Sequence, residues 1–392
     1  MMRAIFLPFA LLLMAPFVWG QEDFQMKEAD RKKLGRSLGD WVEAKISGDF
    51  SGALDANEDL TKALEGIQKK LRGVPALACV SDWEDILDSG RTFSSSGLKK
   101  GKSSAREAFD GSSFTVWIPK KYNPKKSNWP ILLYATDKSA DSVDDLPEAI
   151  LEEFVVIVPD FSSVPSDQMM GAAGRQKMLV PIGLETQELR LDRGRLFLLG
   201  EGALVDTAAR YAAALPHLWA GCVLIGSAPT GIPKENLALL PFKDQVADLD
   251  AAAAWIVEGN RRSAYPLNFE FQPTESWAGR AFWVQAQVFD SPEKSNSDGE
   301  GDEGGPARFQ VSVDRTTNTI QIDAERVYQV DILLNDSIVD LSKPVLIVRN
   351  GETYEFHATR GLGTLLENFA AGMDAAAVFT ARVRRLEIPS ND

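Results

Sequence analysis

The stretch RLFLLGEGALVDTAARYAAALP, residues 195–216, decides which fold is expected of this chain. Its apolar run 196–199 is typical of a buried strand, and a tight turn with Gly200 and Gly202 follows. The alanine-rich segment after the turn predicts a helix that ends at Pro216, because proline cannot continue a helix. A strand, a sharp turn and a helix also frame the G-x-S-x-G motif, in which a serine nucleophile takes the position held here by Gly202.

The composition is that of a globular protein, and it excludes two kinds of partner. The chain has 392 residues, of which 44% are apolar and 25% charged, so it is long enough for two or three domains with buried cores. Its formal net charge of −14 argues against nucleic acid, since neutralising phosphates requires a basic surface. The same charge disfavours attachment to anionic membrane surfaces.

Residues 1–20 are predicted to be a secretory signal peptide. Arg3 gives a positive start, and the apolar run 4–18 is too short to span a bilayer comfortably. Gly20 is a small residue that suits cleavage before Gln21, and no later segment is long and apolar enough to cross a membrane. The mature protein is therefore expected to be secreted or periplasmic, after cleavage near Gly20.

Residues 21–105 are predicted to be an N-terminal helical region. Apolar residues recur at helical spacing in 30–46 and again in 51–73, so a helical hairpin is expected. The polar passage 94–113 is rich in glycine and serine and is interpreted as a loop.

Residues 106–275 alternate near-continuous apolar strands with helices. Such strands indicate a mostly parallel sheet that helices cover on both faces. The segment PLNFEF, residues 266–271, is expected to be the last strand of this sheet. The preceding strands are predicted at 114–119, 129–137, 154–160, 195–199 and 222–229.

Residues 276–392 change to an alternation of apolar and polar positions. This alternation, clear in 280–290 and 307–323, predicts a small antiparallel β domain, with one helix at 363–373. The acidic loop 290–305, rich in glycine and serine, is expected to be disordered. The predicted fold class is therefore α/β: a mostly parallel sheet with flanking helices, an N-terminal helical segment and a C-terminal antiparallel β domain.

Two cysteines, Cys79 and Cys222, leave two interpretations open. Export permits a disulfide between them. Cys222, however, lies in a predicted buried strand, where a thiol packs as a small apolar group without a partner. Two separate thiols are the favoured interpretation.

The order of elements over 114–271 resembles the α/β-hydrolase fold, in particular secreted bacterial esterases, depolymerases and prolyl-oligopeptidase-like peptidases. The resemblance implies a serine nucleophile at the turn, an oxyanion hole after the early strand and a histidine base. Gly202 stands at the nucleophile position, and Leu204 replaces the last glycine of the motif. Ala135 and Thr136 occupy the positions where the resemblance implies a His-Gly pair.

The histidine base is missing from the place that the resemblance implies, the loop 272–280. Of the two histidines, His217 lies roughly 18 Å along a helix from Gly202, at 1.5 Å per residue, and His357 lies in the C-terminal region. Asp244, the nearest match to the triad acid, then has no histidine to orient. The hydrolase site is interpreted as vestigial, and a partner chain that supplies a histidine stays an open alternative.

Oxygen-bearing side chains follow the predicted strands at their carboxyl ends, where open α/β sheets bind ligands. Several carboxylates at one rim suit Ca²⁺ or an acid/base pair, and a serine there suits a displaced nucleophile. The residues concerned are Asp137, Asp160, Glu201, Ser227 and Asp244.

Two functions follow from these patterns. The first is an exported, non-catalytic protein that binds a small molecule or an envelope protein, with no metal and no cofactor. Its candidate binding residues are Asp137, Glu201, Ser227 and Asp244. The alternative is a hydrolase of esterase or peptidase type with a site rebuilt from carboxylates, with or without a metal.

Overall fold

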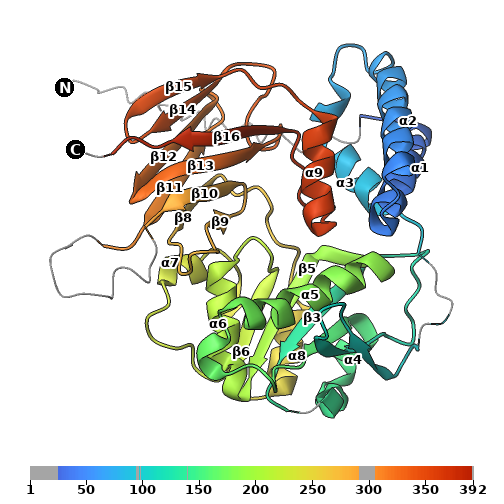
Figure 1. Ribbon diagram of the computed structural model, residues 1–392, viewed down its shortest axis with the longest axis vertical. Helices are drawn as coiled ribbons and strands as arrows, with labels where there is room; N and C mark the ends of the chain where they lie inside the picture. Colours follow the sequence, from blue (N-terminus) through green and yellow to red (C-terminus); the bar gives the residue numbers. More distant parts are fainter. Residues whose placement is uncertain (1–24, 94–96, 98, 139, 291–304, 391–392) are drawn as a thin grey trace, which may run out of the picture.

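The structure is a computed structural model, and most of the chain is described. Figure 1 shows an α/β part below and a β part above it, with helices at the side of the β part. The predicted signal peptide and nearly all of loop 290–305 lie outside the described residues. The described residues are 25–93, 97, 99–138, 140–290 and 305–390.

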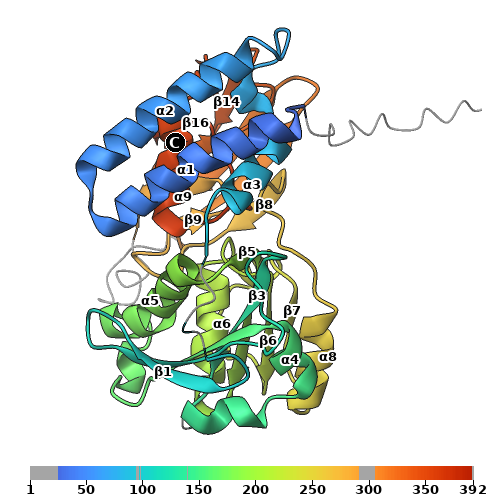
Figure 2. The ribbon, with the colours of Figure 1, turned by 90° about the vertical axis from the view of Figure 1, so that its right-hand side faces the viewer.

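Three helices open the described chain: α1 (Glu28–Ser47), α2 (Phe50–Gln68) and, after a 3₁₀ turn η1 (Ala76–Ala78), α3 (Val80–Ser89). Gly48 ends α1 with a positive φ of 74°. Asp49 caps α2, because its side chain accepts a hydrogen bond from the amide of Gly52. Figure 2 shows α1 and α2 side by side, so the expected helical hairpin is confirmed.

A seven-stranded sheet forms the α/β part. Its strands are β1 (Ser103–Glu107), β2 (Ser113–Trp117), β3 (Trp129–Ala135), β4 (Val155–Pro159), β5 (Leu191–Glu201), β6 (Gly221–Ile225) and β7 (Phe242–Lys243). They lie in the order β1-β2-β4-β3-β5-β6-β7. The pairs β1–β2 and β2–β4 are antiparallel, and the pairs from β4 to β7 are parallel. The predicted mostly parallel sheet is confirmed.

β1 corrects the interpretation of 94–113 as a loop. This strand pairs only with β2, at the edge of the sheet, with Ser103 opposite Trp117 and Glu107 opposite Ser113. None of its residues is buried. An edge strand of this kind is held by hydrogen bonds to its neighbour, so its own residue pattern carries little signal.

Helices cover both faces of the sheet, because successive residues of a strand point to opposite sides. Ile131 and Leu133 of β3 share a core with α5 and α6, whereas Leu132 and Tyr134 share a core with α4 and α8. The elements are η2 (Ala140–Asp145), α4 (Glu148–Glu153), η3 (Ser166–Gln168), α5 (Ala172–Glu188), η4 (Gly202–Leu204), α6 (Val205–Ala214), α7 (Lys234–Leu237) and α8 (Leu249–Val257).

The β part consists of two sheets. Its strands are β8 (Asn268–Phe271), β9 (Arg280–Ala281), β10 (Val284–Phe289), β11 (Arg308–Asp314), β12 (Thr319–Glu325), β13 (Val327–Leu334), β14 (Val345–Arg349), β15 (Glu352–Phe356) and β16 (Ala381–Glu387). One sheet has the order β15-β14-β12-β11-β8 and the other β16-β13-β10-β9. Within the described strands of these sheets, every pairing except β12–β14 is antiparallel. The predicted antiparallel character is therefore confirmed, with that one exception.

β8 corrects the expectation that 266–271 closes the parallel sheet. It pairs antiparallel with β11, with Phe271 opposite Phe309. The rings of these two residues lie 5.6 Å apart, and the Phe269 ring meets that of Trp283 edge-on at the same separation. A short apolar strand is compatible with either sheet by its pattern, and this aromatic core decides between them.

The helix predicted at 363–373 is confirmed as α9 (Leu362–Gly372). Its residues Leu365, Leu366 and Phe369 are buried in the same core as Leu38 and Trp83 of the N-terminal helices. In Figure 1, α9 stands between the β sheets and the α1–α3 group. The N-terminal helices are therefore packed on a C-terminal helix.

Cys79 and Cys222 are both buried, and no disulfide joins them. Cys222 lies in β6, in the sheet core, and burial raises the pKa of its thiol. The interpretation of two separate thiols is confirmed.

Candidate functional site

The turn after β5 has the strand–turn–helix geometry that the sequence predicts. β5 runs to Glu201, the 3₁₀ turn η4 follows, and α6 starts at Val205. Gly202 takes a φ of +63°, a left-handed conformation that glycine adopts without strain. At Gly200 a Cβ would lie 2.6 Å from the Cβ of Ala208, so this glycine permits α6 to approach the strand closely.

Asp137 lies against the turn at Gly202. A Cβ built on Gly202 would lie 2.2 Å from Oδ1 of Asp137, which is far inside van der Waals contact. The Asp137 carboxylate therefore fills the space into which a side chain at position 202 would have to point.

Glu201 is engaged by two neighbours at the same rim. Its carboxylate accepts hydrogen bonds from the hydroxyl of Tyr134 and, at 2.9 Å, from Nζ of Lys138. The ion pair with Glu201 raises the pKa of Lys138. Burial and the Glu201 carboxylate raise the pKa of Tyr134, which keeps this hydroxyl a proton donor. Glu201 thus links the ends of β3 and β5.

The segment that the resemblance assigns to the oxyanion hole lies next to the turn. Ala135 ends β3 opposite Gly200, and both Ala135 and Thr136 are buried. Oγ1 of Thr136 accepts a hydrogen bond of 3.2 Å from the amide of Lys138. The structure therefore brings Ala135, Thr136, Asp137, Glu201 and Gly202 together.

The other candidate residues at the rim have local partners or face solvent. Asp244 accepts a 3.2 Å hydrogen bond from the amide of Ala228, and Ser227 is exposed. Asp160 accepts from the amide of Ser162 at 2.9 Å, and hydrogen bonds from Ser162 lower the pKa of this carboxyl. Within the described residues, no group of three or more His, Cys, Asp or Glu side chains is arranged to hold a metal ion.

The two histidines lie in different surroundings. His357 is exposed, with Nε2 2.8 Å from Oε1 of Glu355. His217 lies between α6 and β6, and its Nδ1 is 3.1 Å from the carbonyl oxygen of Arg280. Because a carbonyl only accepts, Nδ1 carries the proton and donates it. Burial and the neighbouring Arg280 and Arg262 hold the pKa of His217 well below its usual value, so the ring is neutral.

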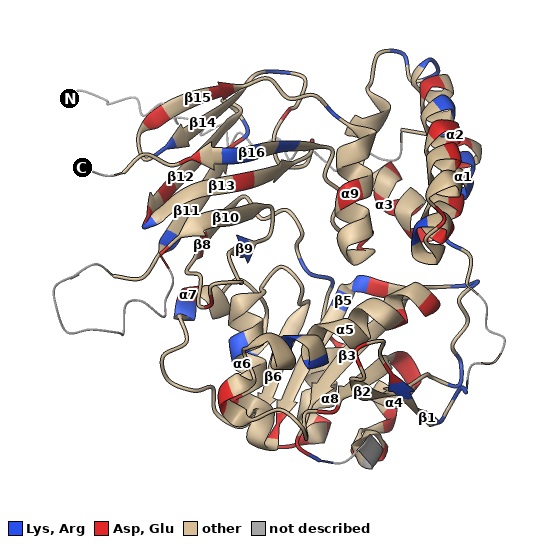
Figure 3. Cartoon of the chain, viewed as in Figure 1, with Lys and Arg blue, Asp and Glu red and all other residues tan. Residues whose placement is uncertain are grey.

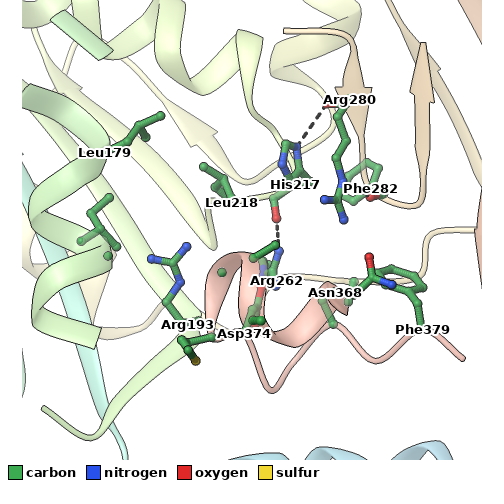
Figure 4. Close-up of a pocket in the computed structure, with 18 of the residues that line it drawn as sticks. Leu179, Arg193, His217, Leu218, Arg262, Arg280, Phe282, Asn368, Asp374 and Phe379 are labelled. Carbon is green, nitrogen blue, oxygen red and sulfur yellow. Dashed lines mark hydrogen bonds and ion pairs between the residues drawn. The ribbon is translucent and has the colours of Figure 1, made fainter. Parts of the chain in front are cut away.

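His217 borders a cavity of about 340 Å³ between the α/β part and the elements above it. Its walls come from α5, β5, the loop before β6, the segment after α8, β9, and α9 with the residues that follow it. Figure 4 shows three guanidinium groups in these walls, those of Arg193, Arg262 and Arg280. Asp374 is the carboxylate among the lining residues.

The three arginines differ in how they are paired. Arg262 donates to the carbonyl of His217 and to the carboxylate of Asp374, while its Nε is buried without a partner. Arg280 donates from Nε to the carbonyl of Phe282 at 3.0 Å. The guanidinium of Arg193 makes neither a hydrogen bond nor an ion pair with the part of the chain that the structure describes.

Burial lowers the pKa of two of these guanidiniums, those of Arg193 and Arg280. It lowers the pKa of Arg280 to about 10, with the charge of Arg262 acting in the same direction. It also lowers the pKa of Arg193. Both shifts have the sign expected for cations that lost water without gaining an equivalent counter-charge.

The cavity is a feature that sequence reasoning missed. Arg193, Arg262 and Arg280 come from β5, from the segment after α8 and from β9, and no local pattern connects them. Arg193 stands between Asp192 and Arg195 at the polar start of β5, so its charge gave no distinct signal in the sequence. The position of His217 in the cavity wall was likewise not predicted.

Comparisons with known proteins give only distant similarities, and these cover part of the chain. No protein-family model and no curated protein matches the chain. Among solved structures, a thermostable esterase is 12% identical with a TM-score of 0.28, over 40% of this chain and 49% of its own. An S-formylglutathione hydrolase from Agrobacterium tumefaciens is 15% identical with a TM-score of 0.25, over 31% and 56%.

A third solved structure, the ferulic acid esterase AmCE1/Fae1A from the anaerobic fungus Anaeromyces mucronatus, is 12% identical with a TM-score of 0.31. The similarity covers 42% of this chain and 93% of the esterase. The chain thus spans about half the length of the first two proteins. No helix among the described residues is long and apolar enough to cross a membrane. The similarity to these esterases and hydrolases is distant and covers 31–42% of the chain.

Proposed function

We propose that this protein is an exported, non-catalytic binding protein on an α/β-hydrolase-like scaffold. One observation carries the proposal: Gly202 stands at the nucleophile position, and the Asp137 carboxylate takes up the space beside it. Acyl transfer requires a side chain that attacks the substrate. A residue without a side chain cannot perform this step.

The surroundings of the turn support the same proposal. The charge of Asp137 would oppose the negative charge that develops on the substrate oxygen. His217 is turned to the cavity and hydrogen-bonded to Arg280, and His357 belongs to the segment after β15. Among the described residues, neither histidine is hydrogen-bonded to a hydroxyl that it could activate.

The alternative, a hydrolase with a rebuilt carboxylate or metal-assisted site, has less support. Glu201 is already neutralised by Lys138, and Asp244 is occupied by the amide of Ala228. A general acid or base needs access to the substrate and a pKa suited to proton transfer. We therefore propose ligand binding as the function and keep hydrolysis as the alternative.

The test is fluorophosphonate labelling of the purified protein, combined with hydrolysis of p-nitrophenyl acetate and butyrate. We expect no adduct and no turnover above the rate without protein. An esterase with an intact serine triad, treated in parallel, shows that the reagents are active. An adduct on Ser227, or turnover that Asp137→Asn or Glu201→Gln abolishes, would overturn the proposal.

Matched variants at the turn sharpen this test. Gly202→Ser alone is expected to lose stability, because the new Cβ meets Asp137 and the backbone is left-handed. The double variant Gly202→Ser with Asp137→Gly removes the clash. It is expected to fold better than the single variant and still show no turnover, since no histidine is placed to activate the serine.

Export is the second part of the proposal. It rests on the positive start and the apolar run within residues 1–20. The full chain, expressed in a bacterial host with a C-terminal tag, is expected outside the cytoplasm with Gln21 as its first residue in mass spectrometry. A cytoplasmic protein that retains Arg3 would contradict export without touching the binding proposal.

A further inference from the structure

The cavity beside His217 combines a surplus of positive charge with several apolar side chains in its wall. It contains three guanidiniums and one carboxylate, in a chain whose formal net charge is −14. We propose that the cavity binds a small organic carboxylate, an inference that rests on the proposed binding function. The charge of this ligand pairs with Arg193 and Arg280, and its body packs on the apolar side chains of the wall.

The first argument is the cost of partly burying Arg193 and Arg280, which have no carboxylate of their own. Arg193 lines the cavity and has no hydrogen bond or ion pair among the described residues. The terminal nitrogens of Arg280 are likewise directed to the cavity without a carboxylate, and Asp374 is already taken by Arg262. Desolvated charges are retained when something pairs with them, and an anionic ligand supplies that pair.

The second argument is the arrangement of the three guanidiniums. In Figure 4, Arg193 and Arg280 approach from opposite sides, and Arg262 lies between them. Arg262 is held in place by His217 and Asp374, so its position does not depend on a ligand. Guanidinium groups match the planar carboxylate with two parallel hydrogen bonds, and this match favours arginine over lysine at such sites.

The third argument concerns the ligand's body. The walls include Leu179, Ile182, Leu218, Phe282 and Phe379. A volume of about 340 Å³ is near the lower limit for small-molecule sites. These apolar side chains suit contact with a short aliphatic chain or one aromatic ring. A free inorganic anion has no apolar group that could pack against them.

The helix ends at the cavity disfavour a phosphate more strongly than a carboxylate. Residues 370–372 at the C-terminal end of α9, and Gln187 at the C-terminal end of α5, belong to the wall. Helix C-termini carry partial negative charge, and phosphates are typically bound at N-termini. A group with one negative charge fits this field better than a phosphate with two.

The experiment measures thermal stability and calorimetric binding of the full mature protein in Tris–chloride buffer without other organic acids. The probes are benzoate and hexanoate, with benzamide and hexanamide as uncharged counterparts and inorganic phosphate as an anion without a body. We expect saturable binding of at least one carboxylate, no binding of its amide, and no comparable binding of phosphate. Sodium chloride keeps the ionic strength equal throughout.

Variants assign the binding to the cavity. Arg193→Gln and Arg280→Gln are expected to weaken carboxylate binding at least about tenfold, the effect of losing one charged hydrogen-bonded contact. Arg384→Gln is the matched control, because this arginine is exposed and paired with Glu367 on the surface. It is expected to bind like the unaltered protein.

A second readout does not depend on the choice of probe. Without ligand, Arg193→Gln is expected to keep or raise the melting temperature, since it removes a half-buried charge that has no carboxylate of its own. A marked fall would show that Arg193 supports the fold, and would overturn the inference. Binding that phosphate or the amides reproduce, binding that survives both arginine variants, or no binding by any carboxylate would also overturn it. Ester hydrolysis is measured separately, so a failure of the non-catalytic proposal is distinguishable from a failure at the cavity.

Discussion

At the scale of single residues, positions 202 and 137 are coupled. Gly202 has a left-handed backbone, and the Asp137 carboxylate lies where its side chain would begin. A side chain at 202 has to accept the strained backbone and displace Asp137 at the same time. A serine at position 202 would therefore require the Asp137 side chain to move.

Glu185 of α5 is a buried carboxyl whose effect on the stability of the fold can be measured. Its side chain is 2% exposed, and Nε of Arg106 lies 3.5 Å from Oε1. The other carboxyl oxygen is buried without a partner. Burial raises the pKa of Glu185 to about 7, against the partial compensation by Arg106.

This raised pKa predicts a specific pH dependence of stability. Between the ordinary pKa of 4.5 and about 7 the folded state binds more protons than the unfolded state, so stability falls as pH rises through this window. At about 1.4 kcal/mol per pKa unit, Glu185 lowers the free energy of unfolding by about 3 kcal/mol above pH 7. Glu185→Gln is expected to be the more stable protein at pH 8 and about equal at pH 4.5, in urea unfolding.

The control for this prediction is Glu188→Gln. Glu188 also pairs with Arg106, at 3.2 Å, but its side chain is 58% exposed. The variant Glu188→Gln is expected to leave the pH dependence of the free energy of unfolding nearly unchanged. Profiles of Glu185→Gln and the unaltered protein that run parallel from pH 5 to 8 would show that Glu185 is not the group responsible.

At the scale of elements, α1 and α3 approach each other at glycines. A Cβ at Gly39 of α1 would lie 2.3 Å from the carbonyl oxygen of Gly90, the residue that follows α3. At Gly35 the same addition would bring Cβ to 3.3 Å from Cα of Gly90. The spacing of two glycines by four residues therefore sets how closely these helices pack.

Gly39→Ala is expected to destabilise the protein by about 2 kcal/mol, because overpacking against a backbone atom outweighs the gain in helix propensity. Gly66→Ala in α2 is the matched control, since a Cβ there has nothing within 4 Å. This control is expected to gain up to about 1 kcal/mol. Thermal unfolding of the two variants is the measurement, and a stabilised Gly39→Ala would refute the close approach.

At the scale of the whole molecule, side chains tie the N-terminal helices to both other parts. Tyr265 donates to Glu84 of α3 at 3.2 Å and accepts from the amide of Val378 at 2.8 Å. Arg91 donates to the carbonyl of Thr186 in α5 at 2.7 Å. These contacts link the N-terminal helices, the α/β part and the β part into one structure around the cavity (Figures 1 and 2).

Asp374→Asn tests the contact between α9 and the segment after α8. Arg262, whose side chain is 5% exposed, would keep its buried charge and lose its carboxylate. Removing one member of such a pair costs about 3–5 kcal/mol. The free energy of urea unfolding is expected to fall by that amount.

Glu367→Gln, which removes the exposed partner of Arg384, is expected to cost less than about 1 kcal/mol. Equal effects of the two variants would contradict this assignment.

Local patterns predict the parts of this fold whose signal lies within one element. The continuous apolar strands of the parallel sheet and the helical spacing of α1 and α2 are of this kind, because burial on both faces or on one helix face imposes a period on the residues. β1 and β8 could not be predicted in this way. A polar edge strand depends on hydrogen bonds from β2, and Phe269 and Phe271 join the sheet whose aromatic core receives them.

The sequence by itself determined the class of the fold, the strand–turn–helix at residues 195–216 and the glycine at position 202, since these depend on residue type and local period. Only the tertiary structure decided that Asp137 fills the space beside Gly202, that Lys138 neutralises Glu201, and that three arginines from separate segments meet in one cavity. The physical reason is that charge pairing and desolvation depend on distances in space. The residue pattern within one segment does not show which residues from distant segments will lie close together.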